Sequence, residues 1–99
     1  MFDLQTALEI LYEAEMNCRV DSFWDAGWRA SVGDRDNGFG GTQDNFYDLS
    51  ELATWLVVTA HKANPRGIDA ILGRRGLYID STGAVSDCVT IREVLDEVG

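Results

Sequence analysis

His61 is the only histidine of the chain, and it is the first residue to test for chemistry. A catalytic histidine needs a nucleophile and an orienting acid around it, and no Gly-x-Ser-x-Gly or comparable motif accompanies His61. Cys18 and Cys88 could reach it only through an unknown fold. Two distant cysteines and one histidine also leave a tetrahedral zinc site short of a protein ligand. The sequence therefore predicts neither catalysis nor a metal centre, and we expect a protein that is not an enzyme.

The loop over residues 33–45 is rich in glycine, aspartate and asparagine, a composition that invites a test for cation binding. An EF-hand beginning at Asp34 has Asp36 as its third position. Its sixth position, which requires glycine, is Phe39, and its twelfth, which requires glutamate, is Asn45. No Gly-Lys-Ser/Thr follows the glycines, so a P-loop is excluded as well. We interpret the loop as an acidic turn, with adventitious binding of a divalent cation as the alternative, and we expect no cofactor.

Length and composition predict one folded domain. With 99 residues, of which 45% are apolar, and a single proline, the chain can build one core and is not of disordered composition. No run approaches the ~20 apolar residues that cross a bilayer, and no secretory signal is present, so we expect a cytoplasmic protein with no membrane partner. Cys18 and Cys88 are then expected to be reduced and buried, with a bridge between them as the alternative.

Charge is the outlier of the composition. Seventeen acidic residues against eight basic ones give a formal net charge of −9. Such a field argues against direct binding of nucleic acid, because phosphate binding depends on clustered lysines and arginines. Two roles for the charge stay open, namely solubility alone or attraction to a basic protein surface. An acidic mimic of nucleic acid belongs to the second class.

The stretch from Val20 to Gly33 is predicted to form a β-hairpin, and the helices of the chain are expected to cover it. Side chains alternate with the two-residue period of a strand on both sides of Asp25-Ala26-Gly27, and Gly27 suits the left-handed position of a three-residue turn. The resulting register pairs Trp24 with Trp28, Ser22 with Ala30 and Val20 with Val32. We expect both tryptophans to pack at the core, with a ligand or partner site as the alternative.

Helical periodicity and capping residues predict the other elements. Asp3 caps a helix over residues 3–16 that Asn17 ends, and Asp48 with Glu51 opens a helix that runs to Ala63. The remaining predictions are a third strand near Phe39 or Phe46, a helix over 65–72, a hairpin of 77–79 with 84–85, and a terminal helix over 90–98. Together they predict a single α+β domain over 1–99, ordered α-β-β-α-α-β-β-α, whose antiparallel hairpin sheet packs against helices.

The helix that begins after Asp48 carries more apolar surface than one packing face needs. Its expected core stripe consists of Leu49, Leu52, Ala53, Leu56 and Ala60. Trp55, Val58 and Lys62 form a second row away from that stripe. Either the C-terminal third covers this row or the row faces a partner. Lys62 also belongs to the only basic patch, with Arg66, Arg74 and Arg75, which we expect to face acidic residues of the same chain or solvent, with a phosphate or an acidic peptide as the weaker alternative.

Two resemblances accompany these patterns. Trp24-Asp25-Ala26-Gly27-Trp28, Gly33-Asp34, Asn37-Gly38 and Trp55-Leu56 before Asn64-Pro65 are similar to motifs in a loose group of small bacterial proteins of unknown function. That resemblance covers roughly residues 8–65, departs in the C-terminal third, and implies no activity. In composition, the short acidic chain also resembles phage-encoded inhibitors of host defence nucleases.

The leading hypothesis is a non-enzymatic, acidic protein-binding module, such as an inhibitor or nucleic-acid mimic, that engages a basic protein surface. Its candidate contact residues combine the apolar row with acidic side chains: Trp55, Val58, Asp34, Asp36, Asp44, Glu9 and Glu13. The alternative is a small ligand-binding or accessory domain with a pocket near Trp24, Trp28 and His61. A homodimer built on the Trp55 face is a third possibility.

Overall fold

The computed structural model describes residues 2–34 and 38–87, with the side chains of 34, 38–42 and 44 left aside. The fold is a single α+β arrangement of helices and antiparallel strands, as the sequence predicted. In chain order its elements are α1 (Leu4–Glu13), β1 (Asn17–Phe23), β2 (Gly27–Asp34), β3 (Gly38–Phe46), α2 (Leu49–Ala63), α3 (Pro65–Arg74), β4 (Leu77–Ile79) and β5 (Val85–Asp87). The helix predicted over 90–98 lies outside the described residues.

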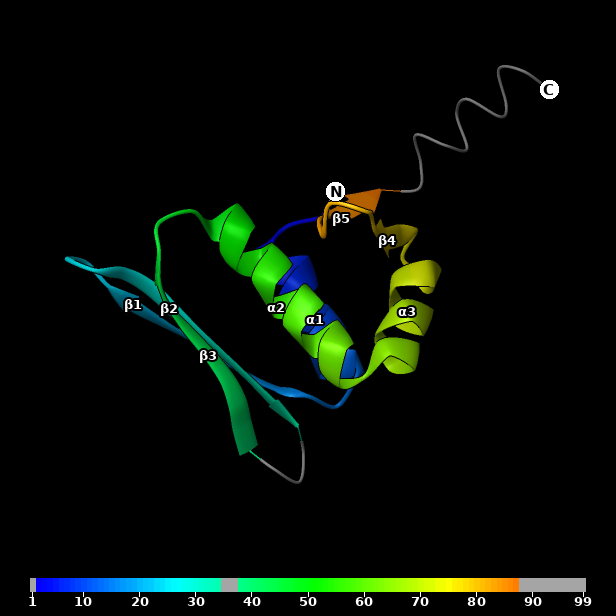
Figure 1. Ribbon diagram of the computed structural model, residues 1–99, viewed down its shortest axis with the longest axis horizontal. Helices are drawn as coiled ribbons and strands as arrows, with labels where there is room; N and C mark the ends of the chain where they lie inside the picture. Colours follow the sequence, from blue (N-terminus) through cyan, green and yellow to red (C-terminus); the bar gives the residue numbers. More distant parts are fainter. Residues whose placement is uncertain (1, 35–37, 88–99) are drawn as a thin grey trace, which may run out of the picture.

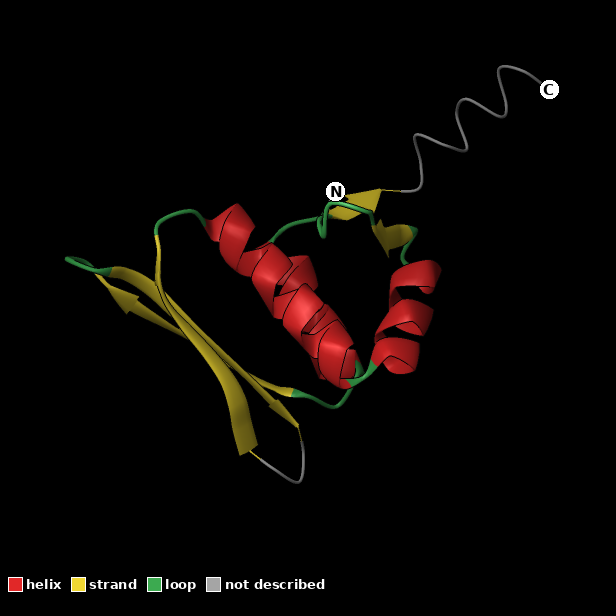
Figure 2. Ribbon diagram, viewed as in Figure 1, coloured by secondary structure: helices red, strands yellow, loops and turns green. Residues whose placement is uncertain are grey.

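The elements form two layers with a small hairpin beside them (Figure 1). Strands β1, β2 and β3 form an antiparallel sheet in that order, and α1 and α2 lie side by side against one face of it. Helix α3 packs against α2 on the side away from the sheet, and β4 and β5 pair with each other beyond it (Figure 2). A third strand, expected near Phe39 or Phe46, is present as β3, which pairs with the central strand β2. It occupies much of the segment 33–45 that was interpreted as a loop, so the predicted element order lacked one strand.

The core lies between the sheet and helices α1 and α2, and it continues between α2 and α3. Helix α2 places Leu52, Leu56 and Val57 fully inside it, and β2 contributes Ala30 and Val32. Ile10 and Leu11 of α1 and Ile68 and Leu72 of α3 belong to the same cluster of buried side chains. Because one helix supplies residues to both neighbours and to the sheet, α2 is the element around which the chain is packed.

The register of the β1–β2 hairpin differs from the predicted one by two residues. Val20 pairs with Ala30 instead of Val32, and the last pair before the turn is Phe23 with Gly27. Gly27 does take the left-handed conformation, at φ 79°, but as a paired residue beyond the turn. The shift leaves Trp24 in the turn, where it has no strand partner. The prediction that Trp24 packs at the core is therefore wrong, and its side chain is 97% exposed.

Helix α1 is shorter than predicted. Asp3 caps it as expected, accepting a hydrogen bond of 2.8 Å from the Thr6 backbone N–H. The helix ends at Glu13, and Glu15 has a left-handed backbone at φ 59°. Asn17 was predicted to end the helix, but it begins β1 and pairs with Gly33. The helix is shorter than predicted because the residues from Asn17 onward pair with β2 in the sheet.

Helix α2 has the predicted bounds, but the residues on its buried face differ in part from the predicted ones. The Asp48 carboxylate accepts a hydrogen bond of 2.7 Å from the Ser50 backbone N–H, which satisfies one of the free donors of the first turn. Leu49, predicted as core, is 41% exposed because the helix has just begun there, whereas Val57 is fully buried. Helix α3 begins at Pro65 as predicted and continues to Arg74, two residues beyond the predicted end at Leu72.

Candidate interaction surfaces

Three aromatic side chains remain open to solvent where the β1–β2 turn meets the chain that leaves β3. Their exposed fractions are 41% for Phe23, 97% for Trp24 and 70% for Tyr47, and we call this group the aromatic end. Aromatic side chains stabilise a fold mainly through the area that they bury. Three exposed rings at one place therefore contribute little to folding and indicate an interaction surface. Exposed tryptophan and tyrosine are also the residues that most often carry binding energy in protein interfaces.

Gly27 brings the two parts of the aromatic end together. A Cβ built at this position would lie 2.3 Å from the backbone oxygen of Phe46 and 3.1 Å from the Tyr47 ring. Only glycine allows so close an approach, and the positive φ favours glycine as well. The turn of the hairpin is therefore held against the residues that connect β3 to α2, and Tyr47 is positioned within reach of the turn.

One cation already lies on the aromatic end. The guanidinium carbon of Arg29 is 5.3 Å from the centroid of the Phe23 ring, a cation–π distance. Arg29 stands opposite Asp21 in the β1–β2 register, so the same strand face carries both charges. A cavity of about 150 Å³ lies beside this pair and is also lined by Ala26, Trp28 and Asn45. The surface is thus built to hold a guanidinium against a ring.

The second candidate surface is a groove along α2 that contains the predicted row. Trp55 and Val58 line it, and the Trp55 ring meets Phe46 of β3 edge to face, with the centroids 5.8 Å apart and the planes at 60°. The groove encloses about 510 Å³. From the β4–β5 hairpin, only Gly83 lines it among the described residues. Lys62 lies along the same groove, as the helical spacing predicted.

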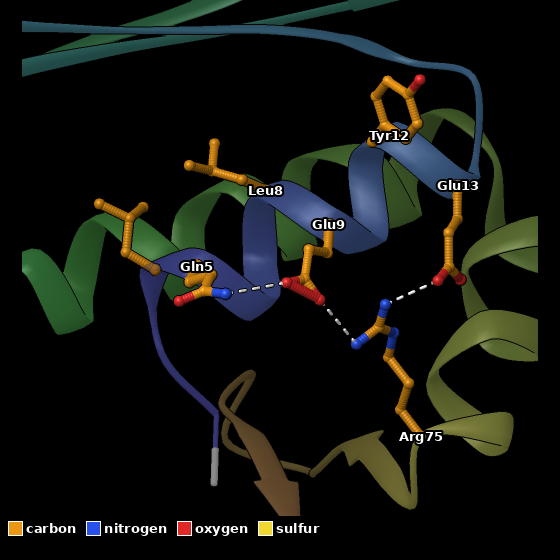
Figure 3. A pocket seen from close by; sticks show the side chains of 7 residues that line it. Gln5, Leu8, Glu9, Tyr12, Glu13 and Arg75 are labelled. Atoms are coloured by element: carbon orange, nitrogen blue, oxygen red, sulfur yellow. Dashed lines mark hydrogen bonds and ion pairs between the residues drawn. The ribbon is translucent and has the colours of Figure 1, made fainter.

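The third surface is the outer face of α1, which is mostly apolar and ends in an ion-pair cluster (Figure 3). Leu8 and Tyr12 are 36% and 85% exposed along it. The Arg75 guanidinium donates to Glu13 at 2.6 Å and to Glu9 at 3.3 Å, and Figure 3 shows both carboxylates turned toward it. The hydrogen bond to Glu13 raises the pKa of Arg75 above its already high usual value.

Of the acidic residues predicted to contact a partner, the structure describes the side chains of Glu9 and Glu13. Glu9 and Glu13 face Arg75, and Arg74 lies 3.6 Å from Glu13, so this part of the acidic surface is neutralised within the chain. The basic patch therefore faces acidic residues of the same chain at its Arg74 and Arg75 end, which was one of the predicted roles. Asp36 and the side chains of Asp34 and Asp44 lie outside what the structure describes.

None of the cavities formed by the described residues considered above is lined by Trp24, Trp28 and His61 together. Trp24 stands in the hairpin turn, whereas His61 lies near the end of α2 and its Nε2 atom is 3.0 Å from a carboxylate oxygen of Asp69 on α3. The cavity beside Trp28 contains neither of the other two residues. Strand pairing explains the separation, because the hairpin turn lies at the far end of the sheet from the α2–α3 connection (Figure 1).

Across 2–34 and 38–87, no group of three or more histidine, cysteine or acidic side chains could hold a metal ion. Cys18 is half-buried and unbridged, and burial raises the pKa of its thiol. Cys88 lies outside the described residues. None of the described helices is long and apolar enough to cross a membrane.

Comparison with known proteins adds no assignment: no protein family, no curated protein and no solved structure matches the chain. The candidate surfaces therefore rest on geometry. Two residues of the aromatic end, Phe23 and Tyr47, were not among the sequence candidates. A signal for Phe23 was present, because its alternation places it on the charged face of the hairpin with Arg19 and Asp21. Tyr47 carried no such signal, since it follows a strand whose end was not predicted.

Proposed function

We propose that this protein is a non-enzymatic, acidic protein-binding module that engages a basic protein surface, with the aromatic end as its principal contact. The single observation that carries the proposal is the exposure of Trp24. Because the Trp24 side chain is 97% exposed, the fold gains almost nothing from burying it. Together with Phe23 and Tyr47, this ring has the composition that is typical of the centre of a protein interface.

Charge supports a basic partner. In the hairpin, Asp25 is exposed and follows Trp24 directly, whereas Asp21 is half-buried and lies 3.6 Å from Arg19 in an ion pair. Asp48 is exposed beside Tyr47. With a formal net charge of −9 on the whole chain, a basic partner would be attracted over long distances and its encounter rate would fall with salt. A nucleic-acid-binding protein is one class of partner that carries such a basic surface.

The groove along α2 is a second contact surface for the same function. Trp55 and Val58 line it, and its volume of about 510 Å³ would accommodate several side chains of a partner. Its charged lining residues, Glu51 and Lys62, are of opposite sign, so the groove contributes apolar contact more than charge recognition. The aromatic end would therefore provide the charge-dependent contacts with the partner, and the groove would add apolar contact area.

Affinity capture from a bacterial lysate tests the proposal, with wild type compared with Trp24→Ala and Leu49→Ala. Leu49 is exposed on α2 and serves as the matched control for removing an apolar side chain outside the aromatic end. We expect a basic protein that wild type and Leu49→Ala retain, that Trp24→Ala loses, and whose purified form binds about tenfold or more weakly when ionic strength rises from 0.05 to 0.5 M. Identical captured sets for wild type and Trp24→Ala would contradict the proposal.

A further inference from the structure

We infer that the aromatic end binds an arginine side chain of the partner, with Trp24 and Tyr47 as the faces on which the guanidinium lies. The inference rests on the proposed function and names the chemical group that this surface recognises. It predicts more than a basic partner, because a partner rich in lysine would be attracted by the same charge and would lack the planar group that stacks on a ring.

The pair of Arg29 and Phe23 is the structural precedent. Its guanidinium carbon lies 5.3 Å from the ring centroid, which shows that the backbone geometry of this end leaves space above a ring for a planar cation. Phe23 is 41% exposed, so the pair is at the surface. Trp24 and Tyr47 are more exposed than Phe23, so their rings are open to a cation from another protein.

Trp24 is the stronger of these two rings as a cation–π acceptor. Among aromatic side chains, tryptophan attracts a cation most strongly, and tyrosine follows. At 97% exposure both faces of the Trp24 side chain are accessible, and Tyr47 at 70% has most of its ring open. A guanidinium that replaces water on such a face loses less hydration energy than an ammonium would, because its charge is delocalised.

Each of the two rings is followed in the sequence by an aspartate. Asp25 is adjacent to Trp24 in the turn and is exposed. Asp48 follows Tyr47, and its Oδ1 atom accepts the α2 cap hydrogen bond from Ser50, which leaves its second oxygen for a further donor. A guanidinium can stack on a ring while its N–H groups bind a carboxylate in its plane, which an ammonium cannot do. The combination of ring and carboxylate favours arginine over other cations.

Titration of the full chain with three peptides of equal length tests the inference. Each peptide alternates glycine with four arginines, four lysines or four serines, and the probe is the indole N–H signal of Trp24, identified by its loss in Trp24→Phe. We expect the arginine peptide to shift this signal and to bind at least about threefold more tightly than the lysine peptide, with no saturable response to the serine peptide.

Two substitutions at one exposed position separate cation–π binding from apolar contact. Trp24→Phe keeps an aromatic face, whereas Trp24→Leu keeps apolar area and loses the face. Because neither variant retains the indole of residue 24, isothermal titration calorimetry measures their affinities for the arginine peptide. We expect Trp24→Leu to weaken arginine-peptide binding by about twofold to fivefold relative to Trp24→Phe, the range of a cation–π contact at an exposed site. Asp25→Asn should weaken binding as well, and Leu49→Ala should leave it unchanged.

Two results would overturn the inference: equal affinities for the arginine and lysine peptides, or equal affinities of Trp24→Leu and Trp24→Phe for the arginine peptide. Either result leaves the proposed function standing if Trp24→Ala still loses the captured basic protein. Conversely, a discriminating peptide response without any Trp24-dependent protein partner would support the arginine site and contradict the broader function. The failures of the two proposals are therefore distinguishable.

Discussion

The guanidinium of Arg75 donates a hydrogen bond of 2.6 Å to the carboxylate of Glu13, across a separation of 62 positions in the sequence. Arg75 follows the last residue of α3, and Glu13 is the last residue of α1. A second hydrogen bond, of 3.3 Å, joins Arg75 to Glu9 one helical turn earlier. One side chain thus ties the end of α3 to two successive turns of α1 (Figure 3).

Replacing Arg75 by methionine should lower the free energy of unfolding by about 1 kcal/mol, because two charge-assisted hydrogen bonds at a partly exposed site are lost. The matched control is Arg74→Met. Arg74 is 67% exposed and lies 3.6 Å from Glu13, so its loss should cost under about 0.5 kcal/mol. Urea denaturation of both variants measures the difference. Equal stabilities of the two variants would show that Arg75 holds α1 no better than a surface ion pair does.

Gly27→Ala should destabilise the fold strongly, because two separate costs combine. The backbone has φ 79°, and the new Cβ would lie 2.3 Å from the Phe46 backbone oxygen, which cannot move without disturbing the β2–β3 pairing. Gly83→Ala is the matched control, since Gly83 has φ 83° and open space around the Cβ position. We expect a loss of about 1 kcal/mol for Gly83→Ala and at least about 2 kcal/mol for Gly27→Ala.

Thermal or urea denaturation gives both values for the two glycines. A Gly27→Ala variant that is no less stable than Gly83→Ala would mean that the hairpin turn is not held against Phe46 and Tyr47. In that case the aromatic end would not be a fixed surface.

Truncation to alanine should change stability much less at Trp24 than at Trp55. Trp24 is 97% exposed, so Trp24→Ala should change the free energy of unfolding by no more than about 0.5 kcal/mol. Trp55 is half-buried and packs edge to face on Phe46, so Trp55→Ala should cost about 1 to 3 kcal/mol. Urea denaturation followed by circular dichroism makes the comparison. A large loss for Trp24→Ala would show that its ring packs on the protein in solution.

The helices within the described residues and the β1–β2 hairpin were predictable, because their signals are local. Asp3 and Asp48 marked where helices begin, and Pro65 marked the start of α3. The face of each hairpin strand was also predictable, since Val20 still shares a face with Ala30 and Val32 after the register is corrected. A shift of two residues preserves the alternation of side chains, so the pattern cannot distinguish the two registers.

The aromatic end was not predictable from the same pattern, because it depends on where pairing stops. Alternation extended through Trp24 predicts an inward ring, whereas the structure ends the pairs at Phe23 and puts Trp24 in the turn. The position of Tyr47 depends on a contact between Gly27 and Phe46, two residues on different strands. Long-range contacts of this kind leave no periodic signal, and the same holds for the pairing of Arg75 with Glu13.

Asp80 holds the turn between β4 and β5. Its carboxylate accepts hydrogen bonds from the backbone N–H groups of Thr82 and Ala84, at 2.9 and 3.1 Å, and from the Ser86 hydroxyl at 2.7 Å. The Thr82 hydroxyl donates to it as well. The hydrogen bond from Ser86, and then those from Thr82 and Ala84, hold the pKa of Asp80 well below the ordinary aspartate value, because each favours the charged form.

This lowered pKa fixes the sign of a pH dependence. A group whose pKa is lower in the folded state adds stability that is present above its unfolded pKa and is lost as the pH falls through the folded pKa. Asp80→Asn should therefore be less stable than wild type from neutral pH down to about pH 4, and the difference should shrink at more acidic pH. Ser86→Ala, which removes one of the donors, should show a smaller difference over the same range.

Hydrogen exchange of the Thr82 and Ala84 amides in wild type, Asp80→Asn and Ser86→Ala, at pH values between 2 and 7, measures this dependence where the turn opens. Exchange is referred to the rate of an unstructured peptide at each pH, so that the intrinsic acid and base dependence cancels. We expect protection in the order wild type, Ser86→Ala, Asp80→Asn at neutral pH, converging in acid. Protection that differs equally between wild type and Asp80→Asn at pH 2 and pH 7 would mean that the ionised carboxylate does not hold the turn.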